Sequence, residues 1–333
     1  MISTIETFDE ELHDKIKVLN ETTWESKVKR PIIDKWLNNF QSDKEKSHAL
    51  FLLSNFMYFG NIQIKQLLVS LYRDLYKYPI VQEIRLSNGD TTDLSLIENK
   101  YNEARKKTKF LAIGNPSESG AHLIYIFRQI NNLPLDMFGS NGEIFTQDTT
   151  GNMVLKDPTI NHYVLFDDFC GSGRQSITYS KETVSIIKSI NKDIKVSYLM
   201  LFATKVGKKA VLEKTLFDHV EAVVEFDESF QFFSTGSRYL KNCPAHIDIE
   251  FLKNLCEKYG EPLVRDIGKL LGLTDEKLEK FIKFAVLGFG NCQLLIGFHH
   301  NTPNNTFPII WYDEENIVWY PIFKRYNKVY ESQ

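Results

Sequence analysis

Four short apolar runs, most of them followed by a polar loop and a helical stretch, place the strongest constraint on the fold of this 333-residue chain. These runs are predicted strands near residues 110–114, 163–166, 196–203 and 219–226. A helical stretch at residues 121–130 follows the first run. The helix after the second run ends at residue 190, and the helix after the third spans residues 205–214. Strand–loop–helix units in series predict an α/β fold with a mainly parallel sheet and flanking helices. Ligands of such sheets bind at the carboxyl ends of the strands.

The sequence on either side of this pattern differs in texture, so we expect three regions. Residues 1–100 predict an N-terminal helical block, in which Ser42 and Glu45 have the spacing of a capping box. Apolar positions from Ile64 to Leu75 recur at helical spacing and predict a helix that ends before Pro79. This block either covers the following region, 101–240, which holds the α/β core, or binds a partner.

Residues 241–333 form the third expected region. Helices are predicted near 247–258 and 274–287. Two apolar runs, 293–298 and 307–312, then flank a turn rich in Asn and Pro, which predicts an aromatic hairpin. We expect these helices and this hairpin to form a small hood.

Composition excludes several classes of protein. The 40 Lys and Arg residues nearly balance the 43 Asp and Glu residues, so the chain lacks the basic field of a general nucleic-acid binder. No apolar run approaches the roughly 20 residues of a membrane helix, and the polar N-terminus is unlike a signal peptide. Four cysteines without CxxC spacing argue against a disulfide framework or zinc ribbon. We expect a cytoplasmic protein with no membrane association.

The stretch from Val164 to Ser176 gives the clearest chemical signal. Its apolar strand leads into two adjacent carboxylates, Asp167 and Asp168, and a loop of small residues then opens a helix. Backbone N–H groups at such a helix start can hold a phosphate. The carboxylates can hold ribose hydroxyls or, through water, a metal ion. The stretch therefore predicts a site for a ribose 5′-phosphate, with a purely structural strand–turn–helix as the alternative.

This stretch resembles the signature of the type I phosphoribosyltransferase superfamily, in which two acidic residues and a loop rich in Thr and Gly follow an apolar strand. The resemblance implies that Asp167 and Asp168 are the catalytic pair that holds the 2′- and 3′-hydroxyls of phosphoribosyl pyrophosphate. It implies a 5′-phosphate loop formed by Gly171, Ser172, Gly173, Arg174, Gln175 and Ser176. Arg174 and Gln175 depart from the Gly and Thr that are common at their positions.

The resemblance extends to two further segments. An earlier strand–loop–helix unit takes the place of the pyrophosphate loop, whose implied residues are Ser117, Glu118, Ser119 and Gly120. Segment 139–162 takes the place of the flexible loop of the superfamily, with Lys156 as its one Lys or Arg residue; a plain surface excursion is the alternative. The resemblance also implies Mg²⁺ as a cofactor that has no direct protein ligand, although Glu118 could hold it through water.

Aromatic residues make up 13% of the chain, and a concentrated set lies in its tail. There Phe298, His300, Asn301 and Asn305 bring rings and amides together in sequence. Such groups can stack on a base and hydrogen-bond its edge, so we predict them to contact the base or acceptor. The alternative is a structural role, because Asn favours turns and aromatic residues favour cores.

Most of the chain resembles a narrower branch, the phosphoribosyltransferase-like proteins of bacterial antiphage conflict systems, some of them associated with retrons. The resemblance includes residues 36–40, 167–173, 288–311 and 319–323. It implies an antiviral effector that binds phosphoribosyl pyrophosphate or a nucleotide and acts at its anomeric carbon, as a glycosyltransferase or nucleotide glycosidase. The alternative is an inactive sensor or scaffold that assembles with an ATPase and a retron reverse transcriptase/RNA complex.

Overall fold

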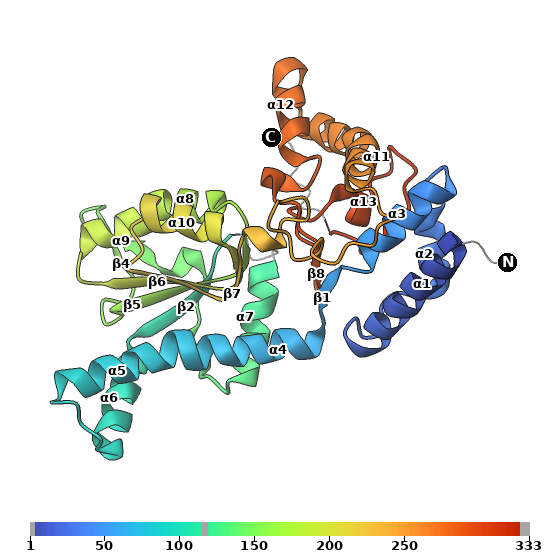
Figure 1. Ribbon diagram of the computed structural model, residues 1–333. Helices are drawn as coiled ribbons and strands as arrows, with labels where there is room; N and C mark the ends of the chain where they lie inside the picture. Colours follow the sequence, from blue (N-terminus) through green and yellow to red (C-terminus); the bar gives the residue numbers. More distant parts are fainter. Residues whose placement is uncertain (1–3, 115–118, 327–333) are drawn as a thin grey trace. The chain divides into compact units, whose positions relative to one another are not determined.

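The computed structural model of the chain describes residues 4–114 and 119–326 (Figure 1). Contacts divide the chain into two compact units, Lys65–Phe226 and a second one formed by Met1–Ile64 with Asp227–Gln333. The boundaries between these units lie after Ile64 and after Phe226, whereas the sequence suggested boundaries near residues 100 and 240. The division into three regions stays a prediction.

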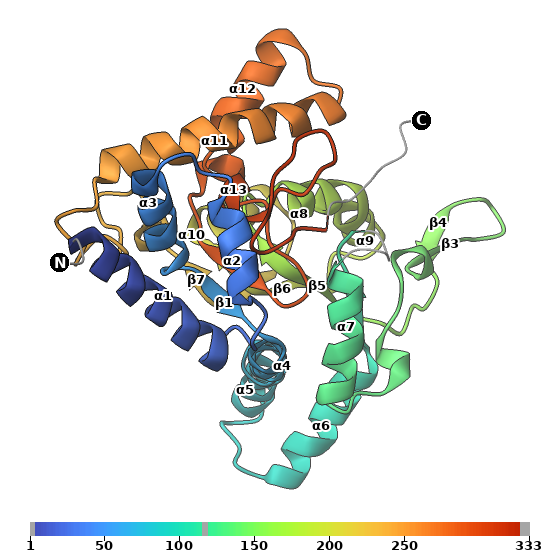
Figure 2. The ribbon, with the colours of Figure 1, turned by 90° about the vertical axis from the view of Figure 1, so that its right-hand side faces the viewer.

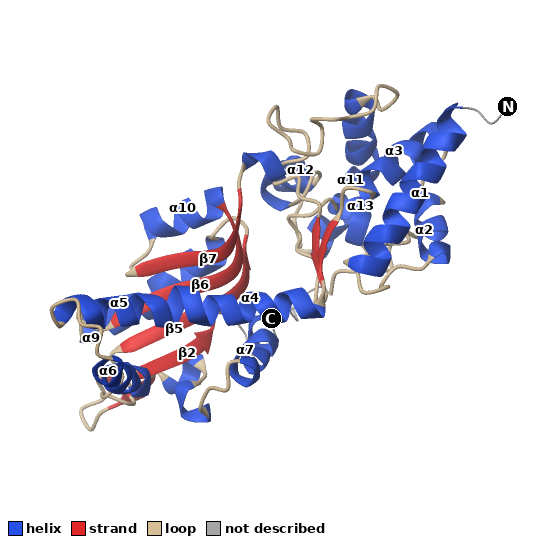
Figure 3. Ribbon diagram, turned by 60° about the horizontal axis from the view of Figure 1, so that its bottom comes forward, coloured by secondary structure: helices blue, strands red, loops and turns tan. Residues whose placement is uncertain are grey.

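The unit Lys65–Phe226 is built on a four-stranded parallel sheet (Figure 3). Its strands, in spatial order, are β2 (Thr108–Ala112), β5 (His162–Cys170), β6 (Lys195–Thr204) and β7 (His219–Phe226). These four strands confirm the four predicted ones and the mainly parallel α/β core. The inner strands β5 and β6 are mostly apolar and buried, as expected where both faces of a sheet are covered, whereas several residues of the edge strands β2 and β7 are only half-buried.

Helices cover both faces of this sheet (Figure 1). One face is covered by α8 (Arg174–Tyr179), α9 (Ser185–Ile190) and α10 (Lys205–Lys214), and the other by α5 (Tyr78–Ser87) and α7 (Ser119–Ile130). The remaining helices of this part are α4 (Asn61–Ser70) and α6 (Leu94–Lys106). The helical stretch predicted for 205–214 is confirmed as α10.

The helix that was predicted to end before Pro79 continues through it. A π-helical turn, η1 (Leu71–Lys77), joins α4 to α5, and Pro79 lies in the first turn of α5. A widened turn shifts the backbone hydrogen bonds, and a proline at the start of a helix removes no bond that the helix needs. A second π-helical turn, η4 (Ser180–Val184), joins α8 to α9 in the same way.

Segment 139–162 contains regular structure where a flexible loop was expected. After two 3₁₀ turns, η2 (Leu135–Met137) and η3 (Asn141–Glu143), it forms an antiparallel ribbon of β3 (Phe145–Gln147) and β4 (Met153–Leu155) (Figure 2). Asp148 closes the turn of the ribbon by accepting backbone N–H bonds from Thr150 and Asn152 at 2.8 and 2.9 Å. The base of the ribbon packs on the sheet core through the buried side chain of Ile144.

The other unit joins the two ends of the chain in one core. Its helices are α1 (Thr4–Thr22), α2 (Arg30–Leu37), α3 (Asp43–Leu53), α11 (Ile249–Leu270), α12 (Asp275–Ala285) and α13 (Pro308–Trp311), with 3₁₀ turns η5 (Glu228–Phe230) and η6 (Phe289–Asn291). Two short strands, β1 (Met57–Phe59) and β8 (Ile296–Phe298), pair in parallel. The fully buried indole of Trp36 donates from Nε1 to the carbonyl of Ile309 at 2.8 Å, which ties α2 to α13.

The aromatic hairpin predicted from runs 293–298 and 307–312 is wrong. The first run supplies β8, but its partner is β1 from the N-terminal part of the chain. The second run contains α13, which begins at Pro308 and whose Trp311 indole donates back to the carbonyl of Thr306 at 2.8 Å. Proline fixes a φ value that suits the first position of a helix, which explains why this aromatic run forms a helix and not a strand.

The predicted capping box at the start of α3 is confirmed. Ser42 Oγ accepts from the N–H of Glu45 at 3.2 Å, and Glu45 Oε2 accepts from the N–H of Ser42 at 3.1 Å. Lys258 Nζ and Tyr259 OH of α11 also donate to the Glu45 carboxylate, at 2.8 and 2.9 Å. Burial opposes the ionisation of Glu45, yet these hydrogen bonds lower its pKa to about 2.

Among the described helices, none is long and apolar enough to cross a bilayer.

Candidate functional site

The two adjacent carboxylates lie inside an inner strand of the sheet. Strand β5 continues to Cys170, so Asp167 and Asp168 belong to the strand and do not follow it. Neighbouring β6 runs parallel to β5, with Met200 beside Asp167 and Ala203 beside Cys170. The small-residue loop and α8 come directly after this strand, at the edge of the sheet where parallel strands end together.

The two carboxylates differ in environment. Asp167 is 8% exposed, and its oxygens accept hydrogen bonds from Tyr198 OH at 2.7 Å and from the backbone N–H of Asp168 at 2.9 Å. Burial raises the pKa of Asp167 well above its usual range, and the negative charge of Asp168 raises it further. Asp167 therefore favours its neutral form and belongs to the interior. Asp168 is only partly buried, so it is the member of the pair with access to a ligand.

The predicted phosphate loop makes a tight turn into α8. Gly173 has a φ of 73°, and a Cβ on it would lie 2.8 Å from Cγ2 of Val211 in α10. Only glycine adopts this left-handed conformation without strain, and the space beside it is filled. Ser176 is buried and donates from Oγ to the carbonyl of Gly173 at 3.0 Å, so its hydroxyl supports the turn.

The start of α10 braces this loop. Thr204 Oγ1 donates to the carbonyl of Gly171 at 2.5 Å and accepts from the N–H of Gly207 at 2.9 Å. A Cβ on Gly207 would overlap the carbonyl oxygen of Gly171, so the two backbones meet here. Neither Thr204 nor Gly207 was predicted from the sequence. Threonine before a helix is a common N-cap, and this signal could have located the contact.

A pocket of about 370 Å³ lies beside the loop, between the end of β2 and α8. Its lining consists of Ile113, Gly114, Arg174, Gln175, Thr178, Tyr179 and Glu182. Arg174 and Gln175 are the exposed residues of the predicted phosphate loop, so the pocket joins that loop to the turn after β2. A phosphate-bearing ligand could occupy it.

Asn141 ties the ribbon segment to this pocket. Its Nδ2 donates to the carbonyls of Ala112 and Gly114 at 3.4 and 3.3 Å, and its Oδ1 accepts from Tyr179 OH at 2.6 Å. One side chain thus connects the end of β2, the segment before β3, and α8. The sequence offered no sign of this bridge, because its three partners are far apart along the chain.

The predicted pyrophosphate loop follows the same turn. Ser117 and Glu118 lie outside the described residues. Ser119 and Gly120 open α7, whose first turn therefore starts after β2 as the resemblance implied. These four residues stay predictions.

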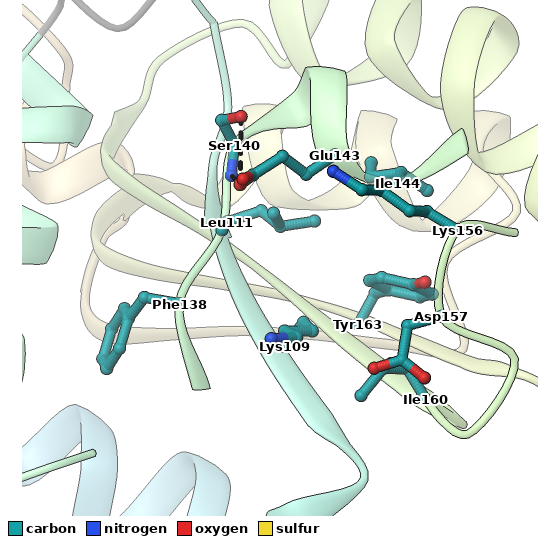
Figure 4. A pocket seen from close by; sticks show the side chains of 11 residues that line it. Lys109, Leu111, Phe138, Ser140, Glu143, Ile144, Lys156, Asp157, Ile160 and Tyr163 are labelled. Carbon is teal, nitrogen blue, oxygen red and sulfur yellow. Dashed lines mark hydrogen bonds between the residues drawn. The ribbon is translucent and has the colours of Figure 1, made fainter. Parts of the chain in front are cut away.

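A second cavity, of about 360 Å³, lies under the ribbon segment on the same unit (Figure 4). Leu111 and Tyr163 of the sheet line it together with Glu143, whose carboxylate accepts from Ser140, and with Lys156 (Figure 4). Lys156 therefore lines this cavity and is absent from the lining of the pocket beside Arg174. The charges of this lining balance, because it contains two lysines, Lys109 and Lys156, and two carboxylates, Glu143 and Asp157.

The predicted base contacts lie in the other unit, and most of them already have internal partners. Phe298 is 4% exposed and stacks on His300, with ring centres 5.5 Å apart. Asn305 is 3% exposed and donates from Nδ2 to the carbonyl of Phe289 at 2.8 Å. Asn301 Oδ1 accepts backbone N–H bonds from Thr302 and Tyr326. These contacts give Phe298 and Asn305 roles in the interior of their own unit.

A protein-family model matches most of this chain. The model of the PRTase-CE family matches residues 33–325. No curated protein matches the sequence.

Among solved structures, the chain is distantly similar to three proteins. Xanthine-guanine-hypoxanthine phosphoribosyltransferase of Helicobacter pylori has 10% identity and a TM-score of 0.29, with 60% of this chain and 97% of that chain covered. The AQ2163 protein of Aquifex aeolicus has 13% identity and a TM-score of 0.29, with 60% and 86% covered. Orotate phosphoribosyltransferase of Aeropyrum pernix has 12% identity and a TM-score of 0.24, with 47% and 75% covered.

Proposed function

The chain belongs to the PRTase-CE family, which is phosphoribosyltransferase-like, and we propose from this premise that it binds a ribose 5-phosphate ligand beside Asp168. In this proposal the loop Gly171–Ser176 holds the 5′-phosphate and Asp168 accepts hydrogen bonds from the ribose hydroxyls. The ligand is phosphoribosyl pyrophosphate or a nucleotide. The observation that supports the site most strongly is the braced loop, since its backbone is held at Gly171, Gly173 and Ser176 before any ligand arrives.

A preformed loop favours binding because less conformational freedom is lost when the phosphate enters. Backbone N–H groups at the start of a helix attract anions, and Arg174 adds a positive charge beside them. Asp167 does not need to touch the ligand in this proposal. Asp167 positions Asp168 by accepting a hydrogen bond from the backbone N–H of that residue. The Asp167 carboxyl group is itself fixed by a hydrogen bond from the Tyr198 hydroxyl.

Mg²⁺ fits this site as an ion that arrives with the ligand. It commonly keeps several waters and takes one or two carboxylates together with the phosphates of a ligand. The described residues contain no group of three or more His, Cys, Asp or Glu side chains that could hold a metal alone. Asp168 could hold the waters of such an ion, because it is a partly buried carboxylate next to the loop. When bound, the ion would offset the charge that develops on a departing pyrophosphate.

We further propose that the chain acts at the anomeric carbon of this ligand, as the effector of a bacterial antiphage system. This part of the proposal rests on the resemblance of residues 167–173 and 288–311 to proteins of such systems. The second candidate is an inactive phosphoribosyl sensor or scaffold that assembles with an ATPase and a retron reverse transcriptase/RNA complex. Two observations favour it: Arg174 and Gln175 replace the usual Gly and Thr, and Glu182 adds a negative charge to the pocket.

Calorimetric titration of the full chain with phosphoribosyl pyrophosphate and Mg²⁺ tests the site. Asp168→Asn should weaken binding by about tenfold or more, because charged hydrogen bonds contribute about 1.5–3 kcal/mol each. The matched control is Asp193→Asn, an exposed aspartate of the same unit that is far from the loop in sequence. Equal affinity in the two variants would refute the proposed role of Asp168. A product assay then supplies water alone or a panel of free nucleobases as the nucleophile that displaces pyrophosphate. Release of pyrophosphate by the wild-type chain with either supports the enzyme, whereas binding without release under all these conditions supports the sensor.

A further inference from the structure

The unit that contains the N-terminal helices has a pocket of its own, of about 410 Å³. It lies among α1, the end of α3, and the segment before α11. Its lining consists of Leu12, Lys15, Phe51, Ser54, Asn55, Arg238, Tyr239, Asn242 and Pro244. None of these residues belongs to the sheet unit, so this pocket is separate from the proposed phosphoribosyl site.

The charged residues of this lining are both positive. Lys15 and Arg238 line the pocket, and no carboxylate does. Lys15 is exposed, but its Nζ reaches back to Ser54 Oγ and Asn55 Oδ1, which are neutral acceptors at 3.4 Å. Burial of the ammonium group lowers the pKa of Lys15, as expected where no carboxylate offsets it. The cavity under the ribbon differs, because its lining contains two carboxylates as well as two lysines.

Arg238 is held in place beside this pocket. Its Nε and Nη2 both donate to Ser229 Oγ, at 3.1 and 2.9 Å. Its guanidinium also lies over the ring of Phe230, 3.3 Å from the ring centre. Stacking and hydrogen bonding restrict the side chain and leave Nη1 without a hydrogen bond to any described residue. A fixed cation with a spare donor is suited to an anionic ligand.

Tyr239 supplies the observation that points to a ligand. Its hydroxyl is buried and has no hydrogen-bond partner among the described residues. Buried polar groups are nearly always hydrogen-bonded, and Tyr239 lines the pocket, so a small shift of its ring would let the hydroxyl donate to a bound ligand.

We propose that this pocket binds the phosphate group of a small phosphate monoester. The two positive charges of Lys15 and Arg238 match a phosphate dianion, and the Tyr239 hydroxyl and Asn242 amide add neutral donors. The apolar side chains of Leu12, Phe51 and Pro244 form the rest of the wall, and the volume leaves space for an organic group attached to the phosphate. The proposal does not depend on the phosphoribosyl site.

Chemical footprinting of the full chain locates the ligand directly. Lysines are acetylated with acetic anhydride and arginines modified with phenylglyoxal, and mass spectrometry follows each site with and without inorganic phosphate or AMP. At a ligand concentration about ten times the Kd, occupancy should slow modification of Lys15 and Arg238 about tenfold. Lys17 of α1 and Lys241 of the same loop are the internal controls, since both are exposed and neither lines the pocket.

Variants then test whether Lys15 contributes to the affinity. Lys15→Met should weaken binding of AMP to this pocket, followed through protection of Arg238 from phenylglyoxal, by about tenfold or more. Lys17→Met makes the same change of net charge and should leave this protection unchanged.

Three results would overturn the proposal. The first is equal protection of Lys15 and Lys17. The second is protection by adenosine as strong as by AMP, which would remove the role of the anion. The third is protection by succinate stronger than by phosphate, which would assign a carboxylate ligand. Retained cooperative unfolding of the Lys15→Met variant, followed by tryptophan fluorescence, ensures that lost protection reflects lost binding.

Discussion

The hydroxyl of Thr204 donates a 2.5 Å hydrogen bond to the carbonyl oxygen of Gly171. This bond joins the end of β6 to the loop that follows β5, and the same hydroxyl accepts from Gly207 at the start of α10. The loop is therefore held by β6 and the start of α10 as well as by β5, the strand that it follows. Its shape depends on the fold of the whole unit as well as on its own glycines.

Replacement of Thr204 tests this brace. Thr204→Val keeps the shape of the side chain but leaves the Gly171 carbonyl and the Gly207 N–H without their partner, which should cost about 1–3 kcal/mol of stability. Affinity for phosphoribosyl pyrophosphate should fall as well, because the loop is no longer fixed. Thr204→Ser, which keeps the hydroxyl, should remain close to wild type in urea unfolding and in calorimetry. Similar affinities for the Val and Ser variants would argue against the brace.

Gly207→Ala should damage the same contact by a different route. The added Cβ would overlap the carbonyl oxygen of Gly171, which is backbone and has little room to move. We expect loss of ligand binding in a calorimetric titration. Gly142→Ala is the matched control, because a Cβ at that position meets nothing within 4 Å. Unchanged binding in the Gly207 variant would contradict the close approach of the two backbones.

The two adjacent aspartates should respond differently to the same substitution. Burial keeps Asp167 toward its neutral form, and an asparagine there can still accept one of the two hydrogen bonds. Asp167→Asn should therefore change ligand affinity much less than Asp168→Asn. The raised pKa of Asp167 also makes stability depend on pH. The contribution of Asp167 to stability is present at low pH and is lost as the pH rises through the folded-state pKa of this residue.

Unfolding of wild type and Asp167→Asn at several pH values measures this contribution. The free energy of unfolding of Asp167→Asn should increase relative to that of wild type as the pH rises above about 4, the pKa of an aspartate in the unfolded chain. An Asp167 variant that loses affinity as strongly as the Asp168 variant would place both carboxylates on the ligand.

Glu45 should make the opposite contribution to the pH dependence of stability. Its pKa of about 2 lies below that of an unfolded glutamate, so its stabilising effect is present above about pH 4.5 and is lost as the pH falls toward 2. Glu45→Gln should cost about 2 kcal/mol at pH 7 and almost nothing at pH 2. All four tryptophans belong to the same unit as Glu45, so their fluorescence reports its unfolding. A deficit that does not change with pH would refute this account.

Strand β8 should tolerate no side chain at Gly297. A Cβ there would lie 2.8 Å from the ring of Phe56, which stacks on Phe323 with centres 4.3 Å apart. Gly297→Ala should destabilise this unit by about 1–3 kcal/mol, measured by tryptophan fluorescence in urea. Gly236→Ala lies in open space of the same unit and should have little effect. Equal stability of the two variants would mean that the Phe56 ring is free to move.

The features that sequence predicted well are those set by neighbouring residues. The strand runs, the helix 205–214 and the Ser42–Glu45 capping box depend on local spacing, and the structure confirms them. The pairing of Met57–Phe59 with Ile296–Phe298 depends on segments from opposite ends of the chain, and no local pattern announces it. A hairpin was the natural expectation from the tail alone.

The same distinction applies to the candidate site. The strand, the two aspartates and the small-residue loop were visible in sequence because they are contiguous. Their supports were not: Tyr198, Thr204 and Asn141 reach the site from other strands or segments. The unequal burial of Asp167 and Asp168 also follows from packing against β6, which adjacent identical residues cannot reveal.

A crystal structure of the chain soaked with ribose 5-phosphate and Mg²⁺ would locate the ligand. We expect the phosphate on the backbone N–H groups of Gly171–Ser176, with the ribose hydroxyls within hydrogen-bond distance of Asp168 and not of Asp167. A phosphate that occupies only the pocket of Lys15 and Arg238, or a ribose that turns away from Asp168, would contradict this expectation.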